Sequence, residues 1–191
     1  MRTSVDTLIE TTQALLWERG YVGTSPRAIQ DLAGIGQGSM YHHFRSKAAL
    51  VQAAEARSAA ELIAEVQQVL DGPGDPLDRV LTYLRLERDV LKGCRIGRLA
   101  ADPDVVTDEA LRKPLEDTFA WIGERLTALL QEAQDAGRLA PGLDAKALAA
   151  TVLAVRQGGY VLARAAAATA PYAQAVEGLA MLLKSVSATP R

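Results

Sequence analysis

Residues 29–47 read Ile29-Gln-Asp-Leu-Ala-Gly-Ile-Gly-Gln-Gly-Ser-Met-Tyr-His-His-Phe-Arg-Ser-Lys47. The first part has apolar residues at helical spacing and ends at Gly34. The second part places Met40 and Phe44 four residues apart, on one face of another short helix. About three residues join the two helices. Two short helices joined by a short connection that contains glycine are typical of a helix-turn-helix.

The flanking residues complete a small helical domain. Apolar residues between positions 5 and 16 follow helical spacing, which predicts a helix that ends at Gly20. Thr24-Ser25-Pro26 supplies a cap residue and a proline at the first position of the next helix. Ser46 is expected to cap a fourth helix over about 47–70. The core residues expected in this domain are Ile29, Leu32, Met40 and Phe44, and His43 is expected to pack or hydrogen-bond inside it.

The rest of the chain also has helical periodicity. Its clearest break is 71–76, which reads Asp-Gly-Pro-Gly-Asp-Pro. One helix is predicted over 77–91 and a long one over 111–130, kinked by Pro114. Two more are predicted over about 144–168 and 171–186. Alanine and leucine abound and aromatic residues are only 5% of the chain, so the predicted fold class is all-α.

Composition excludes several classes of protein. The 191 residues are 49% apolar and 23% charged, close to the globular average. A single cysteine, Cys94, excludes a disulfide framework, and two adjacent histidines leave little for a metal centre. No apolar run approaches the roughly 20 residues of a membrane span, and acidic residues precede any leader-like stretch. We therefore expect a cytoplasmic protein with no metal, no cofactor and no membrane partner. The formal net charge of −2 does not decide whether it binds nucleic acid.

The stretch 29–47 resembles the N-terminal domain of tetracycline-repressor-like (TetR-family) transcriptional regulators. The family pattern is Ile-Ala-x-x-Ala-Gly-Val-Ser-x-Gly-x-Leu-Tyr-x-His-Phe-x-x-Lys. The residues that match it most specifically are Ala33, Gly34, Tyr41, His43, Phe44 and Lys47. Gln30 departs from the usual alanine. Gly36 departs from the usual serine or threonine cap, at a cost of about a few tenths of a kcal/mol.

The resemblance implies two domains. A helix-turn-helix DNA-binding domain would span 1–46, and an effector-binding and dimerisation domain would span 47–191, with the helix over about 47–70 connecting them. The helices at 144–168 and 171–186 would form a homodimer, since a single subunit would expose their apolar stripes. The implied function is a ligand-responsive regulator of transcription. Its most direct form is a homodimeric repressor that a small molecule releases from a near-palindromic DNA operator.

In a helix-turn-helix the second helix enters the major groove of DNA. Gln37 can bond adenine edges, Ser39 can bond bases or a phosphate, and Gly38 permits close approach of the backbone. Tyr41 and His42 lie on the face away from Met40, although without the motif they would be ordinary surface residues. The residues expected to contact DNA are Thr24, Ser25, Arg27, Gln37, Gly38, Ser39, Tyr41, His42 and Lys47.

No residue pattern identifies the effector. Six candidate pocket residues are unusual on otherwise apolar faces: Tyr83, Phe119, Trp121, Arg156, Gln157 and Tyr160. A place in the core, an interface or the surface is at least as good an interpretation for each of them, and Arg156 could pair with an acid across an interface. Cys94 is a further candidate. The stretch Gly93-Cys-Arg-Ile-Gly97 resembles one in some family members that sense electrophiles through a cysteine. A reactive thiolate beside basic residues and a buried small hydrophobe are both open for Cys94.

The sequence also allows functions other than a repressor. An activator of the same fold cannot be distinguished by sequence. A helical interaction protein without DNA binding would lack the steep salt dependence that phosphate contacts impose. The chain has no Gly-x-x-x-x-Gly-Lys loop, no His-Glu-x-x-His and no nucleophile elbow, so we expect no enzymatic activity.

Overall fold

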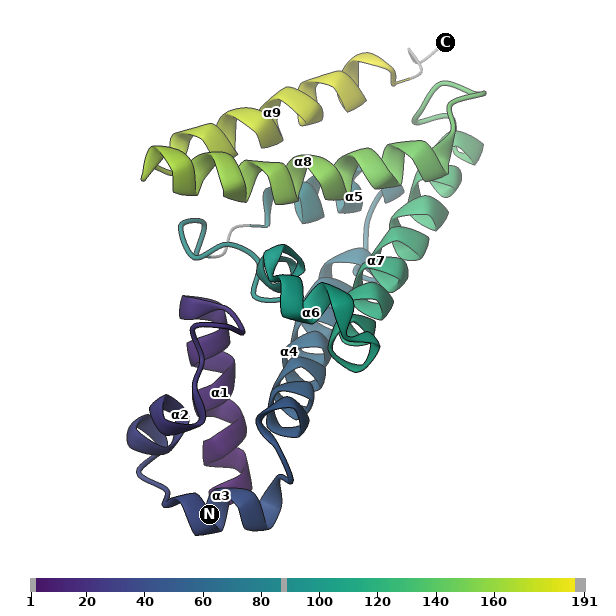
Figure 1. The fold of residues 1–191 in the computed structure, drawn as a ribbon. Helices are drawn as coiled ribbons and strands as arrows, with labels where there is room; N and C mark the ends of the chain where they lie inside the picture. Colours follow the sequence, from purple (N-terminus) through teal and green to yellow (C-terminus); the bar gives the residue numbers. More distant parts are fainter. Residues whose placement is uncertain (1–2, 87–88, 188–191) are drawn as a thin grey trace. The chain divides into compact units, whose positions relative to one another are not determined.

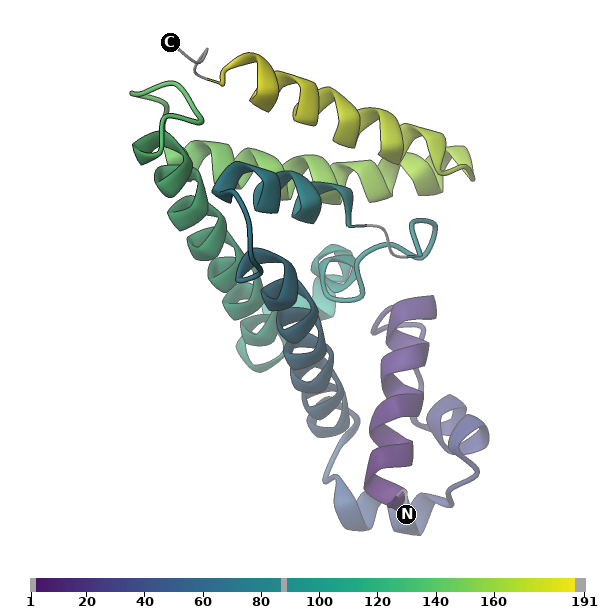
Figure 2. The same ribbon diagram turned by 180° about the vertical axis from the view of Figure 1, so that it is seen from behind.

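The computed structural model describes residues 3–86 and 89–187, and within these ranges every regular element is a helix (Figures 1 and 2). The elements are α1 (Ser4–Arg19), α2 (Pro26–Ala33), α3 (Gln37–His43), α4 (Lys47–Leu70), α5 (Pro76–Arg85), the 3-10 helix η1 (Gly97–Ala101), α6 (Pro103–Thr107), α7 (Glu109–Asp135), α8 (Ala145–Ala166) and α9 (Ala170–Ser185). The all-α prediction is confirmed.

Local caps set the boundaries of the N-terminal helices. Gly20 ends α1 with a φ of 74°, and Gly34 ends α2 in the left-handed conformation, which suits glycine. Ser25 accepts a hydrogen bond from the Ala28 amide and precedes the proline that starts α2. Gly36 begins α3 without a side-chain cap. The predicted boundaries of these helices are confirmed.

The helix predicted over 77–91 is shorter than expected. In the structure α5 ends at Arg85. The guanidinium of Arg156 donates hydrogen bonds to the carbonyls of Tyr83 and Leu86. A side chain distant in the sequence therefore supplies hydrogen-bond donors to carbonyl groups at the end of the helix. Apolar spacing could not reveal this stop, because the partner comes from another helix.

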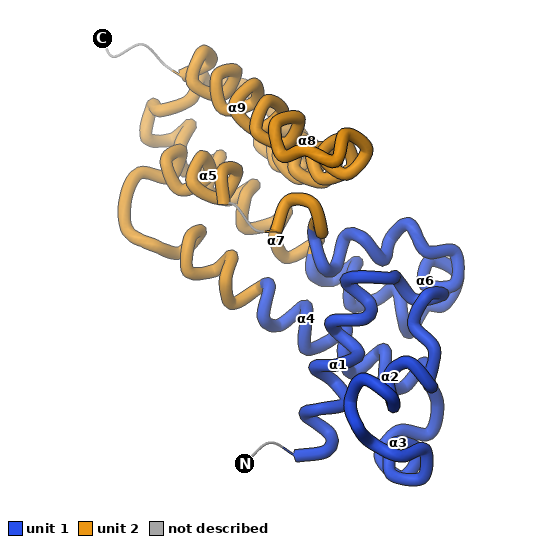
Figure 3. The backbone as a smooth tube through the Cα atoms, turned by 90° about the vertical axis from the view of Figure 1, so that its left-hand side faces the viewer, with its two compact units in different colours: residues 1–62, 94–118 blue, residues 63–93, 119–191 orange. Residues whose placement is uncertain are grey.

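The chain forms two compact units (Figure 3). The first contains residues 1–62 and 94–118, and the second contains residues 63–93 and 119–191. The sequence did not indicate that 94–118 belongs with the N-terminal helices. The predicted domain boundary after residue 46 stays a prediction.

The first unit has a small apolar core. Its buried members are Leu8, Leu15, Ile29, Met40 and Leu50, with Ile9, Ala28, Ala33, Ile35 and Phe44 packed against them. Two expectations were wrong. Leu32 is 62% exposed, because the eight-residue α2 is covered only on the face of Ile29 and Ala33. His43 is exposed at the end of α3, where its ring lies 5.1 Å from that of His42.

The second unit is organised by helix packing. Figures 1 and 2 show α8 and α9 side by side. Residues of α5 also contact α9. A Cβ at Gly159 of α8 would lie 2.9 Å from the ring of Tyr172 on α9, so the absence of a side chain allows this approach. At Gly158 a Cβ would meet nothing within 4 Å.

No described helix is both long and apolar enough to cross a membrane. Across residues 3–86 and 89–187, no group of three or more acidic, histidine or cysteine side chains is arranged to hold a metal ion.

Candidate nucleic-acid interface

The outer face of α3 is polar and exposed. Gln37, Gly38, Ser39 and His42 are exposed, and Tyr41 is 41% exposed. Between them, Met40 is 1% exposed and anchors the helix in the core. A helix of seven residues cannot be stable alone, so this buried methionine holds the outer face in position.

The helix α2 contacts α3, and its start carries further predicted DNA contacts. The hydroxyl of Ser25 accepts from the Ala28 amide at 3.1 Å, and Arg27 is highly exposed with Asp31 as an ion-pair partner at 3.7 Å. Thr24 differs from the sequence expectation. It is completely buried, and its hydroxyl donates to the carbonyl of Gly20 at 2.7 Å. Its side chain points into the unit and is not available to a phosphate.

Lys47 is half-buried and is used inside the unit. Its Nζ donates to the carbonyl of Tyr21 at 2.7 Å and lies 3.7 Å from the centre of the Tyr21 ring. Burial lowers the pKa of Lys47, and the carboxylates of Asp102 and Asp104 oppose that shift. The lysine therefore joins the start of α4 to the turn after α1, in addition to any role at the surface.

Sequence reasoning missed Asp102, which holds the same turn from the other side. Its Oδ2 accepts from the backbone amides of Tyr21 at 2.9 Å and Val22 at 3.1 Å. Its Oδ1 accepts from the amide of Asp104 and caps α6. The Asp-Pro pair at 102–103 signals a helix start, but nothing in the sequence indicates a partner about eighty residues away.

Three of the candidate pocket residues come together in the second unit. Arg156 is 2% exposed, and besides its bonds to the end of α5 it donates to the Tyr160 hydroxyl at 3.2 Å. Its guanidinium lies 4.4 Å from the centre of the Tyr83 ring. Tyr172 joins this cluster by stacking on Tyr160 at 4.7 Å, and its buried hydroxyl has no hydrogen-bond partner. The sequence assigned Tyr172 only to a dimer helix and so missed it.

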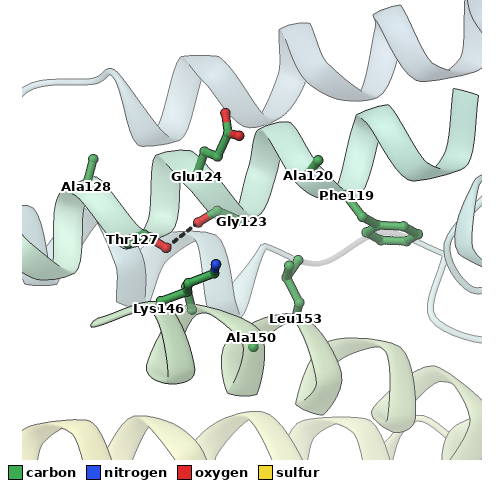
Figure 4. Close-up of a pocket in the computed structure, with 10 residues that line it drawn as sticks. Phe119, Ala120, Gly123, Glu124, Thr127, Ala128, Lys146, Ala150 and Leu153 are labelled. Atoms are coloured by element: carbon green, nitrogen blue, oxygen red, sulfur yellow. Dashed lines mark hydrogen bonds between the residues drawn. The ribbon is translucent and has the colours of Figure 1, made fainter. Parts of the chain in front are cut away.

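The other candidates lie elsewhere. Cys94 belongs to the first unit, where it is buried and its Sγ accepts from the Gly97 amide at 3.3 Å. Trp121 and Gln157 are half-buried on α7 and α8. Phe119 lines a mostly apolar groove of about 620 Å³ between α7 and α8. In Figure 4 the amine of Lys146 and the side chain of Leu153 reach into this groove from α8.

Comparisons with known proteins agree over both parts of the chain. Residues 8–54 match the family described as bacterial regulatory proteins, tetR family, and residues 75–179 match the tetracyclin repressor-like C-terminal domain. The HTH-type transcriptional repressor KstR2 of Mycobacterium tuberculosis is 30% identical over 118 residues, which cover 62% of this chain and 56% of that protein. The transcriptional regulator AcuR of Cereibacter sphaeroides is 31% identical over 144 residues, 70% of this chain and 64% of that protein.

The fold is also similar to solved structures. A TetR transcriptional regulator from Chloroflexus aurantiacus is 27% identical, with a TM-score of 0.85 that covers 93% of this chain and 92% of that one. The chain spans between half and two thirds of the length of the KstR2 and AcuR relatives it matches.

Proposed function

This chain belongs to the TetR family of bacterial regulatory proteins, and on that premise we propose that it is a transcriptional repressor. In this proposal a homodimer binds a near-palindromic DNA operator in the cytoplasm and leaves it when a small molecule binds. The observation that carries the proposal is the exposed polar face of α3, held in place by the buried Met40.

We assign DNA recognition to the exposed side chains of α3 and of the start of α2. Gln37 and Ser39 would meet base edges, and Gly38 would let the backbone of α3 approach the major groove closely. Tyr41 and His42 on α3 would contact phosphates. Ser25 and Arg27 would reach the backbone from α2. We do not include Thr24 among the proposed DNA contacts, because its side chain is buried. Lys47 would act mainly by holding the turn before α2.

The homodimer is supported by apolar side chains that a single chain leaves in water. Val161 and Leu162 on α8 are 68% and 54% exposed, and Met181 and Leu182 on α9 are each 65% exposed. Burial of such a patch against a second copy is the ordinary way to remove it from water. We therefore assign dimerisation to 144–168 and 171–186. The two copies of α3 would then read half-sites about one helical turn of DNA apart.

We place the effector site in the second unit. The groove of about 620 Å³ beside Phe119 has the size of ordinary ligand sites and a mostly apolar lining. The buried cluster of Arg156, Tyr83 and Tyr160 supplies hydrogen-bonding groups in the same unit. Roles for Trp121, Gln157 and Cys94 in effector binding stay predictions.

Fluorescence anisotropy with DNA that flanks the protein's own gene tests the proposal. Gln37→Ala should weaken binding by about fivefold or more, since a good base contact is worth about 1–3 kcal/mol. Tyr41→Ala should also weaken binding, because it removes a phosphate contact from α3. Gln131→Ala, at an exposed position on α7, is the matched control and should bind like the wild type. Affinity should fall steeply as salt rises.

The same experiment separates the alternatives. If neither flanking DNA nor selected random sequences bind to the folded protein, the protein is a helical interaction protein and the repressor proposal is wrong. If DNA binds as expected but transcription rises when protein is added, the protein is an activator. Loss of binding in Gln131→Ala to the same extent as in Gln37→Ala would remove α3 as the recognition element.

A further inference from the structure

Glu55 is a buried acid without a partner. It lies on α4, and the residue is 1% exposed. Neither carboxyl oxygen has a hydrogen-bond partner. An ionised carboxylate in such a place would lose its hydration with nothing in exchange, which is one of the most costly arrangements in a folded protein. The group therefore keeps its proton far more readily than an exposed glutamate.

The groups that face Glu55 make its charge still less favourable. Asp108 stands at the start of α7 and Asp102 at the start of α6, and both act on Glu55 as like charges. Tyr21, in the turn after α1, also interacts electrostatically with Glu55. Among the described residues, no basic side chain forms an ion pair with Glu55. Burial first, and then these two aspartates, raise the pKa of Glu55 to about 8.

Asp102 connects this buried acid to the turn that precedes the helix-turn-helix. The carboxylate that repels an ionised Glu55 is the one that holds the Tyr21 and Val22 amides. It also begins α6, which packs against η1, and η1 in turn packs against α1. The attachment of residues 97–107 to this turn is therefore sensitive to charge at position 55.

We propose that Glu55 is a proton-operated latch within the first unit. Protonated Glu55 lets Asp102 and Asp108 stay beside it, so residues 97–107 remain docked on the turn after α1. Ionised Glu55 repels both aspartates and weakens that docking. By linkage, any event that displaces residues 97–107 also releases a proton from Glu55. This latch does not depend on DNA binding, so its failure would leave the proposed repressor untouched.

Carboxyl NMR on the full chain labelled with ¹³C-glutamate tests the latch. One glutamate signal should titrate near pH 8, more than three units above an ordinary glutamate, and it should be missing in Glu55→Gln. Hydrogen exchange gives the second measurement. The protection factors of the Tyr21 and Val22 amides should fall by about tenfold between pH 6 and pH 9 in the wild type. They should change by less than about twofold in Glu55→Gln.

Glu124→Gln is the matched control, since Glu124 is an exposed glutamate on α7 in the second unit. It should keep both the high titration and the decline in protection. The latch is overturned if every glutamate of the wild type titrates below pH 6, or if amide protection is independent of pH. It is also overturned if Glu55→Gln shows the same decline as the wild type. Should Glu55→Gln fail to fold, the two wild-type measurements decide alone.

Discussion

Asp102 Oδ2 lies 2.9 Å from the backbone nitrogen of Tyr21, although the two residues are 81 positions apart in the sequence. The same oxygen accepts from the next amide, while the other oxygen caps α6. One carboxylate thus joins two segments of the first unit, and one of them leads directly into α2. Charge-assisted hydrogen bonds of this kind are stronger than neutral ones.

Asp102→Ala should lower the free energy of unfolding by about 1–3 kcal/mol. The substitution removes the cap of α6 and leaves the partly buried Tyr21 amide without an acceptor. Urea denaturation followed by circular dichroism measures this loss. Asp135→Ala, at the exposed end of α7, should change stability by no more than about 0.5 kcal/mol. Equal losses in both variants would contradict the prediction.

Stability should fall as the pH rises from about 5 to 8. The pKa of Glu55 is about 8 in the folded protein and near 4.5 when exposed, so the folded state binds a proton that the unfolded state has lost. The contribution of Glu55 to the free energy of unfolding is therefore fully present below pH 4.5. It decreases as the pH rises towards 8, by at most about 1.4 kcal/mol per pH unit.

Urea denaturation at several pH values checks the pH dependence. Glu55→Gln should remove most of the slope, because an amide carries no charge at any of these pH values. Glu124→Gln should keep the slope of the wild type. A wild-type stability that is constant or rising across pH 5–8 would show that Glu55 ionises without cost.

The exposed apolar face of α8 and α9 should control the oligomeric state. Leu162→Glu combined with Leu182→Glu should convert a dimer to a monomer, since each subunit would have to bury two charges at the interface. Analytical ultracentrifugation gives the mass directly. Val106→Glu on α6 introduces the same charge at another exposed apolar position and should remain dimeric. A monomeric wild type, or a double variant that remains dimeric, would contradict the assignment of the dimer interface to this face.

The two adjacent glycines of α8 should respond in opposite ways to alanine. Gly159→Ala would place a Cβ 2.9 Å from the Tyr172 ring and should destabilise the protein by about 1–3 kcal/mol. Gly158→Ala meets open space and should be neutral or stabilising by up to about 1 kcal/mol, because alanine favours the helix. Thermal denaturation of the pair tests this. A loss of stability in Gly158→Ala would instead indicate contact with a second copy.

Much of the local structure was predictable because its causes are local. The Ser25-Pro26 start of α2 and its stop at Gly34 depend on interactions within a few residues. The burial of Ile29 and of Met40 follows from the apolar spacing within each short helix. The outward position of Tyr41 and His42 followed from the same periodicity, whereas Gln37 and Ser39 were expected at the surface because they open the second helix of the helix-turn-helix motif. The errors at Leu32 and His43 arose because very short helices have room for only one covered face, which periodicity alone does not assign.

Residue types and spacing determined the helices, their caps and the helix-turn-helix, since these depend on backbone hydrogen bonds and apolar periodicity over one or two turns. Only the tertiary structure placed Asp102 on the turn after α1, Arg156 at the end of α5, and Glu55 away from water. The tertiary structure also showed that the Thr24 side chain points inward, where its hydroxyl donates a hydrogen bond to the Gly20 carbonyl. These arrangements depend on which distant segments pack together and on how completely they exclude solvent. Burial and partners of a charged side chain are properties of the folded unit, and a local pattern of residues does not specify them.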